Sequence, residues 1–164
     1  IANRKDNTQW CNFISGAYCD YSNDVDYSAV YGCLYNWYAV NDPRNIAPEG
    51  WHVATDADWQ ALSDYLGGLS AAGGKLKETG SLYWETPNTG ATNESGFTGL
   101  PAGTRFGEYG IPGYGTFTRI KKTAEWWTAD EQKSWGVSFD SQELVHNTDS
   151  RWTDGFSVRC VKGN

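Results

Sequence analysis

The sequence predicts a single α+β domain of 164 residues, and three observations support that fold class. Two helical patterns occupy the first half, over about residues 34–40 and 56–66. From Gly73 onward, short apolar clusters are separated by Gly, Pro, Asn and Thr, which is typical of short strands joined by long loops. No Pro/Ser-rich linker or single-charge run divides the chain, so residues 1–164 are expected to form one domain.

The N-terminal region begins with a polar, turn-rich segment over residues 1–29 that has no clean period. Residues 30–40 are apolar on nearly every side, so periodicity does not distinguish a buried helix from a buried strand. We expect a short helix from about Leu34, because Asn41-Asp42-Pro43 would stop it.

The second helix is the clearest element of the sequence. Thr55 can act as its N-cap, and Asp56 and Asp58 lie in the first turn, where carboxylates meet free backbone N–H groups. Gly67-Gly68 would end it. One face carries its large apolar side chains: Trp59, Leu62, Tyr65 and Leu66.

The C-terminal half is expected to form a small, mostly antiparallel sheet with long loops. The candidate strands are residues 125–128, 135–139, 143–146 and 155–161. Trp135, Val137 and Phe139 alternate with small residues, as in a half-buried strand. In Trp126-Trp127 one ring is expected in the core, and the other could be exposed because strand neighbours face opposite ways.

Charge and hydropathy exclude two classes of partner. The net charge of −7 argues against nucleic acid, which would require a basic face, and against an anionic membrane surface. No apolar run approaches the roughly 20 residues of a membrane span. Since the chain contains no Met and no apolar leader, we expect it to be a mature or excised segment.

Aromatic residues are abundant, with nine Trp, ten Tyr and six Phe. More than half of them are expected to fill the core of a loop-rich domain. Tyr and Trp combine an apolar face with a polar tip, which suits both sugar stacking and wet protein interfaces. The excess of these rings therefore favours binding.

The four cysteines are Cys11, Cys19, Cys33 and Cys160. They form no C-x-x-C motif and have no His close to the first three, so zinc is disfavoured and disulfides in an oxidising compartment are expected. Four cysteines allow three pairings, and spacing alone does not choose among them.

Five ordered segments carry a family resemblance: residues 30–40 (VYGCLYNWYAV), 47–60 (APEGWHVATDADWQ), 73–80 (GGKLKETG), 87–101 (PNTGATNESGFTGLP) and 155–161 (GFSVRCV). Through them the chain resembles the Fibrobacter succinogenes major paralogous domain family, over nearly all residues from Gly16 onward. The resemblance implies a C-type-lectin-like fold, close to the formylglycine-generating-enzyme branch, in secreted or surface-anchored bacterial proteins. It implies fold and compartment strongly and function only weakly.

Two departures from the family pattern concern cysteine. Many members carry Cys where this chain has Ala47, so Cys160 is expected to pair with Cys19, linking the two ends of the domain as in many lectin-like proteins. Cys33 replaces a basic or aliphatic residue, which suggests a second disulfide with Cys11. The polar segment over residues 1–29 would then be tied down by disulfides.

Candidate chemistry is sparse, and the chain is not expected to be an enzyme. The only histidines are His52 and His146, and no G-x-S-x-G elbow marks a nucleophile. Asp140, Glu143 and Asp149 could form an acid pair, but solvated surface carboxylates explain them better. The relatives' copper-binding cysteine pair is not carried over, because disulfides account better for these cysteines.

A cofactor is not required by any motif, although a calcium site deserves consideration. Asp20, Asn23, Asp24 and Asp26 offer closely spaced oxygen ligands. The EF-hand Gly and distal Glu are missing, and a solvated loop with Asx turns is the favoured alternative. The sugar-chelating Glu-Pro-Asn and Gln-Pro-Asp triplets are absent, so sugar would bind by stacking on rings.

The function predicted is non-catalytic, extracellular recognition or adhesion, with carbohydrate or a surface protein receptor as partner. In display proteins of this fold the variable positions precede the final strand, so the binding candidates come from the C-terminal loops: Tyr109, Tyr114, Trp135, His146, Asp149, Arg151 and Trp152. The alternatives are a structural domain of a cell-surface or fibre assembly and, less favoured, a secreted hydrolase or oxidase.

Overall fold

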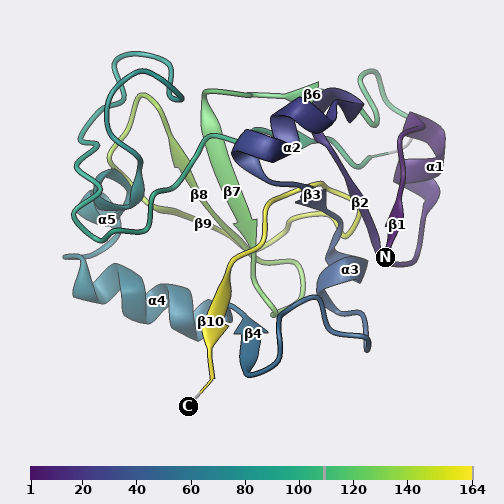
Figure 1. Cartoon of the computed structure of the whole chain (residues 1–164), viewed down its shortest axis with the longest axis horizontal. Coiled ribbons are helices and arrows are strands. Elements are labelled where there is room, and N and C mark those ends of the chain that lie inside the picture. Colours follow the sequence, from purple (N-terminus) through teal and green to yellow (C-terminus); the bar gives the residue numbers. More distant parts are fainter. Residues whose placement is uncertain (109, 164) are drawn as a thin grey trace.

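The computed structural model describes residues 1–108 and 110–163. Over these residues the chain is a mixed α+β domain with five α-helices and several small, mainly antiparallel sheets. The predicted fold class, α+β, is therefore confirmed. Figure 1 shows α4 and α5 on one side of the β7–β8–β9 sheet and the N-terminal elements at the opposite end of the molecule.

The N-terminal region contains β1 (Ala2–Asn3), α1 (Asn7–Asn12), β2 (Ala17–Cys19), a 3-10 turn (Tyr21–Asn23), α2 (Val25–Tyr31), β3 (Leu34–Tyr35) and α3 (Trp37–Val40). β2 pairs in parallel with β1 and antiparallel with β3. Residues 1–29, whose sequence shows no clean period, thus contain regular elements. Asp6 and Asp24 cap α1 and α2, but both helices are short and α2 buries no residue, so no apolar period reveals them.

The first predicted helix begins three residues later than expected. Leu34 pairs with Cys19 as part of β3, so the backbone is extended there. The Asn36 side chain accepts hydrogen bonds from the backbone N–H groups of Ala39 at 3.0 Å and Ala17 at 2.8 Å. Asn36 therefore caps α3 and fastens it to β2 at the same time.

The second predicted helix is confirmed as α4 (Asp56–Tyr65), with a full capping box between Thr55 and Asp58. A further helix, α5 (Leu69–Leu76), follows directly and was not predicted, because Gly73 and Gly74 disguise it. β4 (Trp51–Val53), which precedes α4, pairs antiparallel with β10 (Cys160–Lys162).

The largest antiparallel sheet has the order β7 (Thr123–Trp127), β8 (Ser134–Ser138), β9 (Val145–Asn147). The bounds of these three strands lie within two residues of the bounds of three predicted strands. The fourth predicted strand, residues 155–161, is confirmed only at its end, where Cys160 and Val161 belong to β10. Its first three residues form isolated bridges and not a continuous strand. β5 (Thr104–Arg105) and β6 (Phe117–Thr118) form a separate antiparallel pair.

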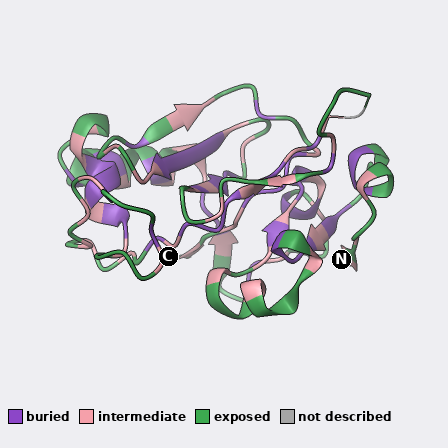
Figure 2. Cartoon of the chain, turned by 90° about the horizontal axis from the view of Figure 1, so that it is seen from above, coloured by how far each residue is buried: buried purple, intermediate pink, exposed green. Residues whose placement is uncertain are grey.

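The core consists of three apolar clusters, and Figure 2 shows buried segments through the middle of the molecule with exposed loops and helices around them. Trp126 packs on α4 and α5, whereas Trp127 packs on the other face against Phe156, with ring centroids 4.5 Å apart. Both indoles are buried, so neither ring of this pair is available at the surface.

The four cysteines are free thiols, and the predicted Cys19–Cys160 and Cys11–Cys33 disulfides are not formed. Cys19 is buried in the N-terminal cluster, whereas Cys160 packs on Val53 and Phe156 in another cluster. Cys11 lies against the carbonyl of Phe106, and Cys33 lies near the carboxylate of Asp20. A disulfide requires the Cβ atoms of its two cysteines to lie close together. Here the two cysteines of each predicted disulfide lie in different surroundings.

Within the two described ranges, no helix combines the length and the apolar character needed to cross a membrane.

Candidate functional site

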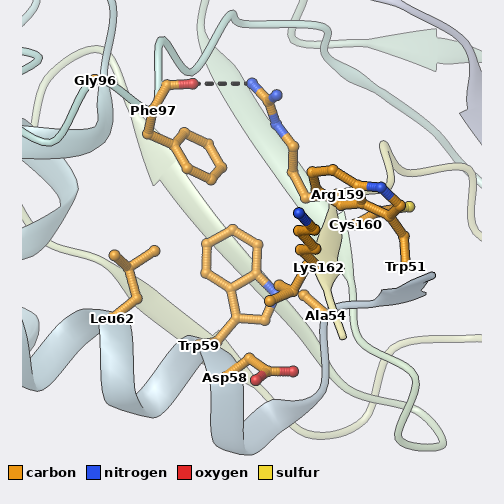
Figure 3. A pocket seen from close by; sticks show the side chains of 11 residues that line it. Trp51, Ala54, Asp58, Trp59, Leu62, Gly96, Phe97, Arg159, Cys160 and Lys162 are labelled. Atoms are coloured by element: carbon orange, nitrogen blue, oxygen red, sulfur yellow. Dashed lines mark hydrogen bonds between the residues drawn. The ribbon is translucent and has the colours of Figure 1, made fainter. Parts of the chain in front are cut away.

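A groove of about 410 Å³ lies beside the last strand, and we call it the aromatic groove. α4 supplies one wall, β4 and β10 a second, and the loop at Gly96-Phe97 closes one end. Figure 3 shows Leu62 and Phe97 on one side and Trp51 on the other. The side chains that give it its character are three rings and four polar groups: Trp51, Trp59, Phe97, Asp58, Arg159, Cys160 and Lys162.

The floor of the groove is the indole of Trp59, which is only 2% exposed. Its ring packs against Phe97 with centroids 5.6 Å apart and is stacked on Trp135 at 6.3 Å. Trp59 Nε1 is buried and has no hydrogen-bond partner among the described residues. Because this nitrogen is closed off from solvent, the indole offers the groove apolar ring surface and not its N–H group.

The mouth of the groove carries Trp51, whose side chain is among the exposed large hydrophobic groups at 42%. A tight turn places it there: Trp51 N–H donates to the carbonyl of Pro48 at 2.9 Å, and Gly50 adopts a φ of +78°. The indole therefore projects from the first residue of β4, where a ring-shaped ligand can reach its face.

Arg159 forms the rim between Phe97 and β10. Its guanidinium carbon lies 4.5 Å above the centre of the Phe97 ring, and one terminal nitrogen donates to the Phe97 carbonyl at 3.0 Å. This stacking and this hydrogen bond hold the guanidinium plane in one place.

Asp58 is the one carboxylate in the groove wall, and its oxygens are already engaged. Asp58 Oδ2 accepts from Thr55 N at 2.8 Å and Thr55 Oγ1 at 2.7 Å, and it lies 3.0 Å from His52 Nε2. Burial alone would raise the pKa of Asp58, but the hydrogen bonds from Thr55 and His52 lower it. Asp58 is therefore a charged capping residue with little capacity for general acid catalysis.

Cys160 is the one thiol in the groove wall, and it is poorly activated. Burial raises the pKa of Cys160, which keeps the thiol protonated at neutral pH. In the strand register Cys160 lies opposite Val53, whereas His52 lies opposite Val161. Because neighbouring strand residues face opposite ways, the imidazole is directed away from the sulfur.

Of two predicted binding residues, Trp135 belongs to the core beneath α4, and His146 lies partly exposed at the edge of that core. Trp135 is fully buried, and the His146 ring stacks on it with centroids 4.4 Å apart. His146 Nε2 and Trp135 Nε1 lie 2.8 and 2.9 Å from Asp56 Oδ1. Trp135 is therefore a packing residue that no ligand can touch in this structure, and His146 is held by Asp56.

Arg151 and Trp152, also predicted to bind, lie on a different surface. Trp152 is 38% exposed and stacks on Trp37 at 6.2 Å, with Tyr38 edge-on at 5.8 Å. Arg151 forms an ion pair with Glu108. These side chains border a shallow depression that is separate from the aromatic groove.

The remaining predicted binding residues are dispersed. Tyr114 packs on the N-terminal cluster, Asp149 is exposed in the loop after β9, and Tyr109 lies outside the described residues. The described candidates are therefore split among several surroundings and do not converge on one site.

The calcium candidates act as local caps and bridges. Asp20 accepts from Ser28 Oγ at 2.5 Å, Asp24 accepts from the backbone N–H of Asp26 at 3.0 Å, and Asn23 donates to the Lys5 carbonyl at 3.2 Å. In the part of the chain that the structure describes, no group of three or more His, Cys, Asp or Glu side chains could hold a metal ion.

The sequence reading missed the groove residues Trp51, Phe97, Arg159 and Lys162, although a signal for most of them was present. Three of the five segments that carry the family resemblance meet here: residues 47–60, 87–101 and 155–161. Each segment contributes wall residues from a distant part of the chain. Their convergence could be seen only once the fold was known.

Comparison with known proteins yields one match. The family model described as the Fibrobacter succinogenes major domain matches residues 2–162, a range that contains every residue of the aromatic groove. No curated protein and no solved structure matches the chain.

Proposed function

This chain belongs to the Fibrobacter succinogenes major domain family, and we propose that it is a non-catalytic extracellular recognition domain that binds carbohydrate in the aromatic groove. We further propose that its α+β fold is of the C-type-lectin-like type. The support for that assignment is the set of family segments together with two consecutive helices packed on a small sheet with long loops.

The observation that carries the proposal is the exposed Trp51 indole at the mouth of a mainly apolar groove. Ligand pockets of a few hundred Å³ are typically lined by apolar and aromatic side chains with a few polar groups that fix orientation. A pyranose ring presents C–H groups on its face and hydroxyls at its edge. The C–H groups would stack on Trp51, while Arg159 and Lys162 would meet the hydroxyls.

The chemistry of the groove supports binding rather than turnover. The Cys160 thiol is protonated and the Asp58 carboxylate is held by the helix cap, so neither group is prepared to act as a nucleophile or a general acid. Non-covalent binding of a ligand requires no bond to form or break at Cys160 or Asp58.

A glycan array followed by calorimetry with the intact chain tests the proposal. We expect Trp51→Ala to weaken binding about five- to thirtyfold, because a stacked indole contributes on the order of 1–2 kcal/mol. Trp152→Ala is the matched control, since it removes an equally exposed indole outside the groove.

Loss of binding in Trp152→Ala alone would move the site to the surface around Arg151 and Trp152. A folded wild-type chain that binds no glycan would contradict the proposal and favour the alternative of a structural surface domain. Exposed side chains of Tyr65, Leu69 and Val145 would then be candidates for the contact surface.

A further inference from the structure

The charge in the aromatic groove has the opposite sign to the charge of the whole chain. Two cationic side chains, Arg159 and Lys162, and one carboxylate, Asp58, line the groove, whereas the chain carries a net charge of −7. A cleft that keeps a positive local potential in an acidic protein favours an anionic ligand.

Neither cation is neutralised by the protein. Among the described residues, no carboxylate lies within ion-pair distance of Arg159 or Lys162. Asp58, the nearest candidate in the wall, is committed to Thr55 and His52. The positive charge of the groove is therefore available to a ligand.

The guanidinium of Arg159 is also positioned in advance. Stacking on Phe97 and one hydrogen bond to the Phe97 carbonyl fix its plane and leave its other N–H groups for a partner. A planar fork of this kind matches the two oxygens of a carboxylate, which it can bind through two parallel hydrogen bonds.

Arg159 lines a second cavity as well. This cavity has a volume of about 330 Å³, and its walls include Tyr31, Tyr35, Thr98 and Ser157. The guanidinium thus stands between an apolar groove that suits a ring face and a cavity rich in hydroxyl groups. A ligand anchored at Arg159 can extend to both sides.

We propose that the ligand is an acidic oligosaccharide, with the carboxylate of a uronic acid unit paired to Arg159 and a neighbouring sugar ring stacked on Trp51. Lys162 adds long-range attraction to the same carboxylate. This inference rests on the proposed function and specifies its ligand class.

The experiment compares binding of short galacturonate, mannuronate and glucuronate oligosaccharides with their carboxyl-reduced, neutral counterparts, by calorimetry on the intact chain. We expect the acidic forms to bind about 10- to 100-fold more tightly, the range for hydrogen bonds to charged groups. We also expect this preference to fall as salt is raised.

The variants locate the carboxylate. Arg159→Gln should remove the preference for acidic ligands while leaving the weaker binding of the neutral ones. Arg159→Lys keeps the positive charge but loses the planar guanidinium, so it should retain part of the preference for acidic ligands. Lys5→Gln, an equal change of charge on the exposed N-terminal segment, is the control and should have no effect.

The outcomes separate the two proposals. Equal binding of acidic and reduced ligands would overturn the carboxylate inference and leave carbohydrate recognition intact. A preference for acidic ligands that survives in a folded Arg159→Gln variant would overturn the assignment to Arg159. Absence of binding to any sugar, acidic or neutral, would overturn both.

Discussion

Lys77 illustrates how a single residue can organise several segments. Its side chain is fully buried, and the ammonium donates hydrogen bonds to the carbonyls of Thr89, Ser138 and Ser141 at 2.7–2.8 Å. Burial lowers the pKa of Lys77 to about 8. Because these carbonyls come from the loop after α5, from the end of β8 and from the turn that follows it, one cation joins distant parts of the chain.

Glu125 is the residue with the clearest consequence for pH dependence. Its carboxyl accepts from Ser134 Oγ at 2.8 Å and Asn147 Nδ2 at 2.9 Å. Burial raises its pKa from 4.5 to about 7, Asp154 adds to this effect, and Arg119 opposes it. The folded state therefore holds a proton that the unfolded state releases.

Stability should thus fall as the pH rises from about 4.5 to about 7, by up to roughly 3 kcal/mol from Glu125 alone. Glu125→Gln keeps an acceptor for both donors and never ionises. We expect this variant to be more stable than wild type at pH 8 and nearly equal to it at pH 5, as measured by urea unfolding.

Glu131→Gln, at an exposed position, is the control and should shift stability equally at both pH values. If the free energies of unfolding of Glu125→Gln and wild type differ by the same amount at pH 5 and pH 8, the raised pKa of Glu125 is contradicted.

At the scale of elements, the local signals that succeeded were caps and alternation. Thr55 and Asp58 predicted α4 because a capping box forms within one turn, and the alternation around Trp135 predicted β8 for the same local reason. α1 and α2 were missed because, at six and seven residues, they are too short to show a clear apolar period. α5 was missed because two glycines lie inside it.

Those glycines allow α5 to pack directly on backbone. A Cβ on Gly73 would lie 2.2 Å from the carbonyl oxygen of Glu143, and one on Gly74 would lie 2.3 Å from that of Gly90. Such spacing leaves no room for even a methyl group, so the helix and the loops over it depend on glycine here.

We expect Gly74→Ala to destabilise the fold by about 2 kcal/mol or more, although alanine favours helix by about 1 kcal/mol in isolation. Urea unfolding measures the change. Ser70→Ala, at an exposed site in α5, should leave stability within about 0.5 kcal/mol of wild type. A stabilising Gly74→Ala variant would contradict the close approach.

At the scale of the molecule, Arg105 joins the N-terminal segment to the C-terminal half. It is fully buried between the rings of Trp10 and Phe117, with its guanidinium carbon 4.5 and 4.7 Å from their centres. The same group donates to the carbonyls of Arg4 and Lys5 at 2.7 and 2.9 Å. These contacts, and not disulfides, hold the first residues on the domain.

Free thiols are therefore expected throughout. Alkylation in denaturant without reductant should modify all four cysteines, as read by mass spectrometry, and a reductant should leave the melting temperature unchanged. Buried Cys19 should react only after unfolding, because burial raises its pKa to about 11 and shields it. A mass with fewer than four labels would contradict the structure.

The sequence by itself determined the α+β class, α4, the strands β7 to β9 and the family, because caps, alternation and ordered segments are local signals. Only the tertiary structure decided which rings are exposed: Trp135 is buried whereas Trp51 is accessible, although both are tryptophans near small residues. It also decided the cysteine environments and the groove. Exposure and convergence depend on which distant segments pack together, and no local pattern encodes that choice.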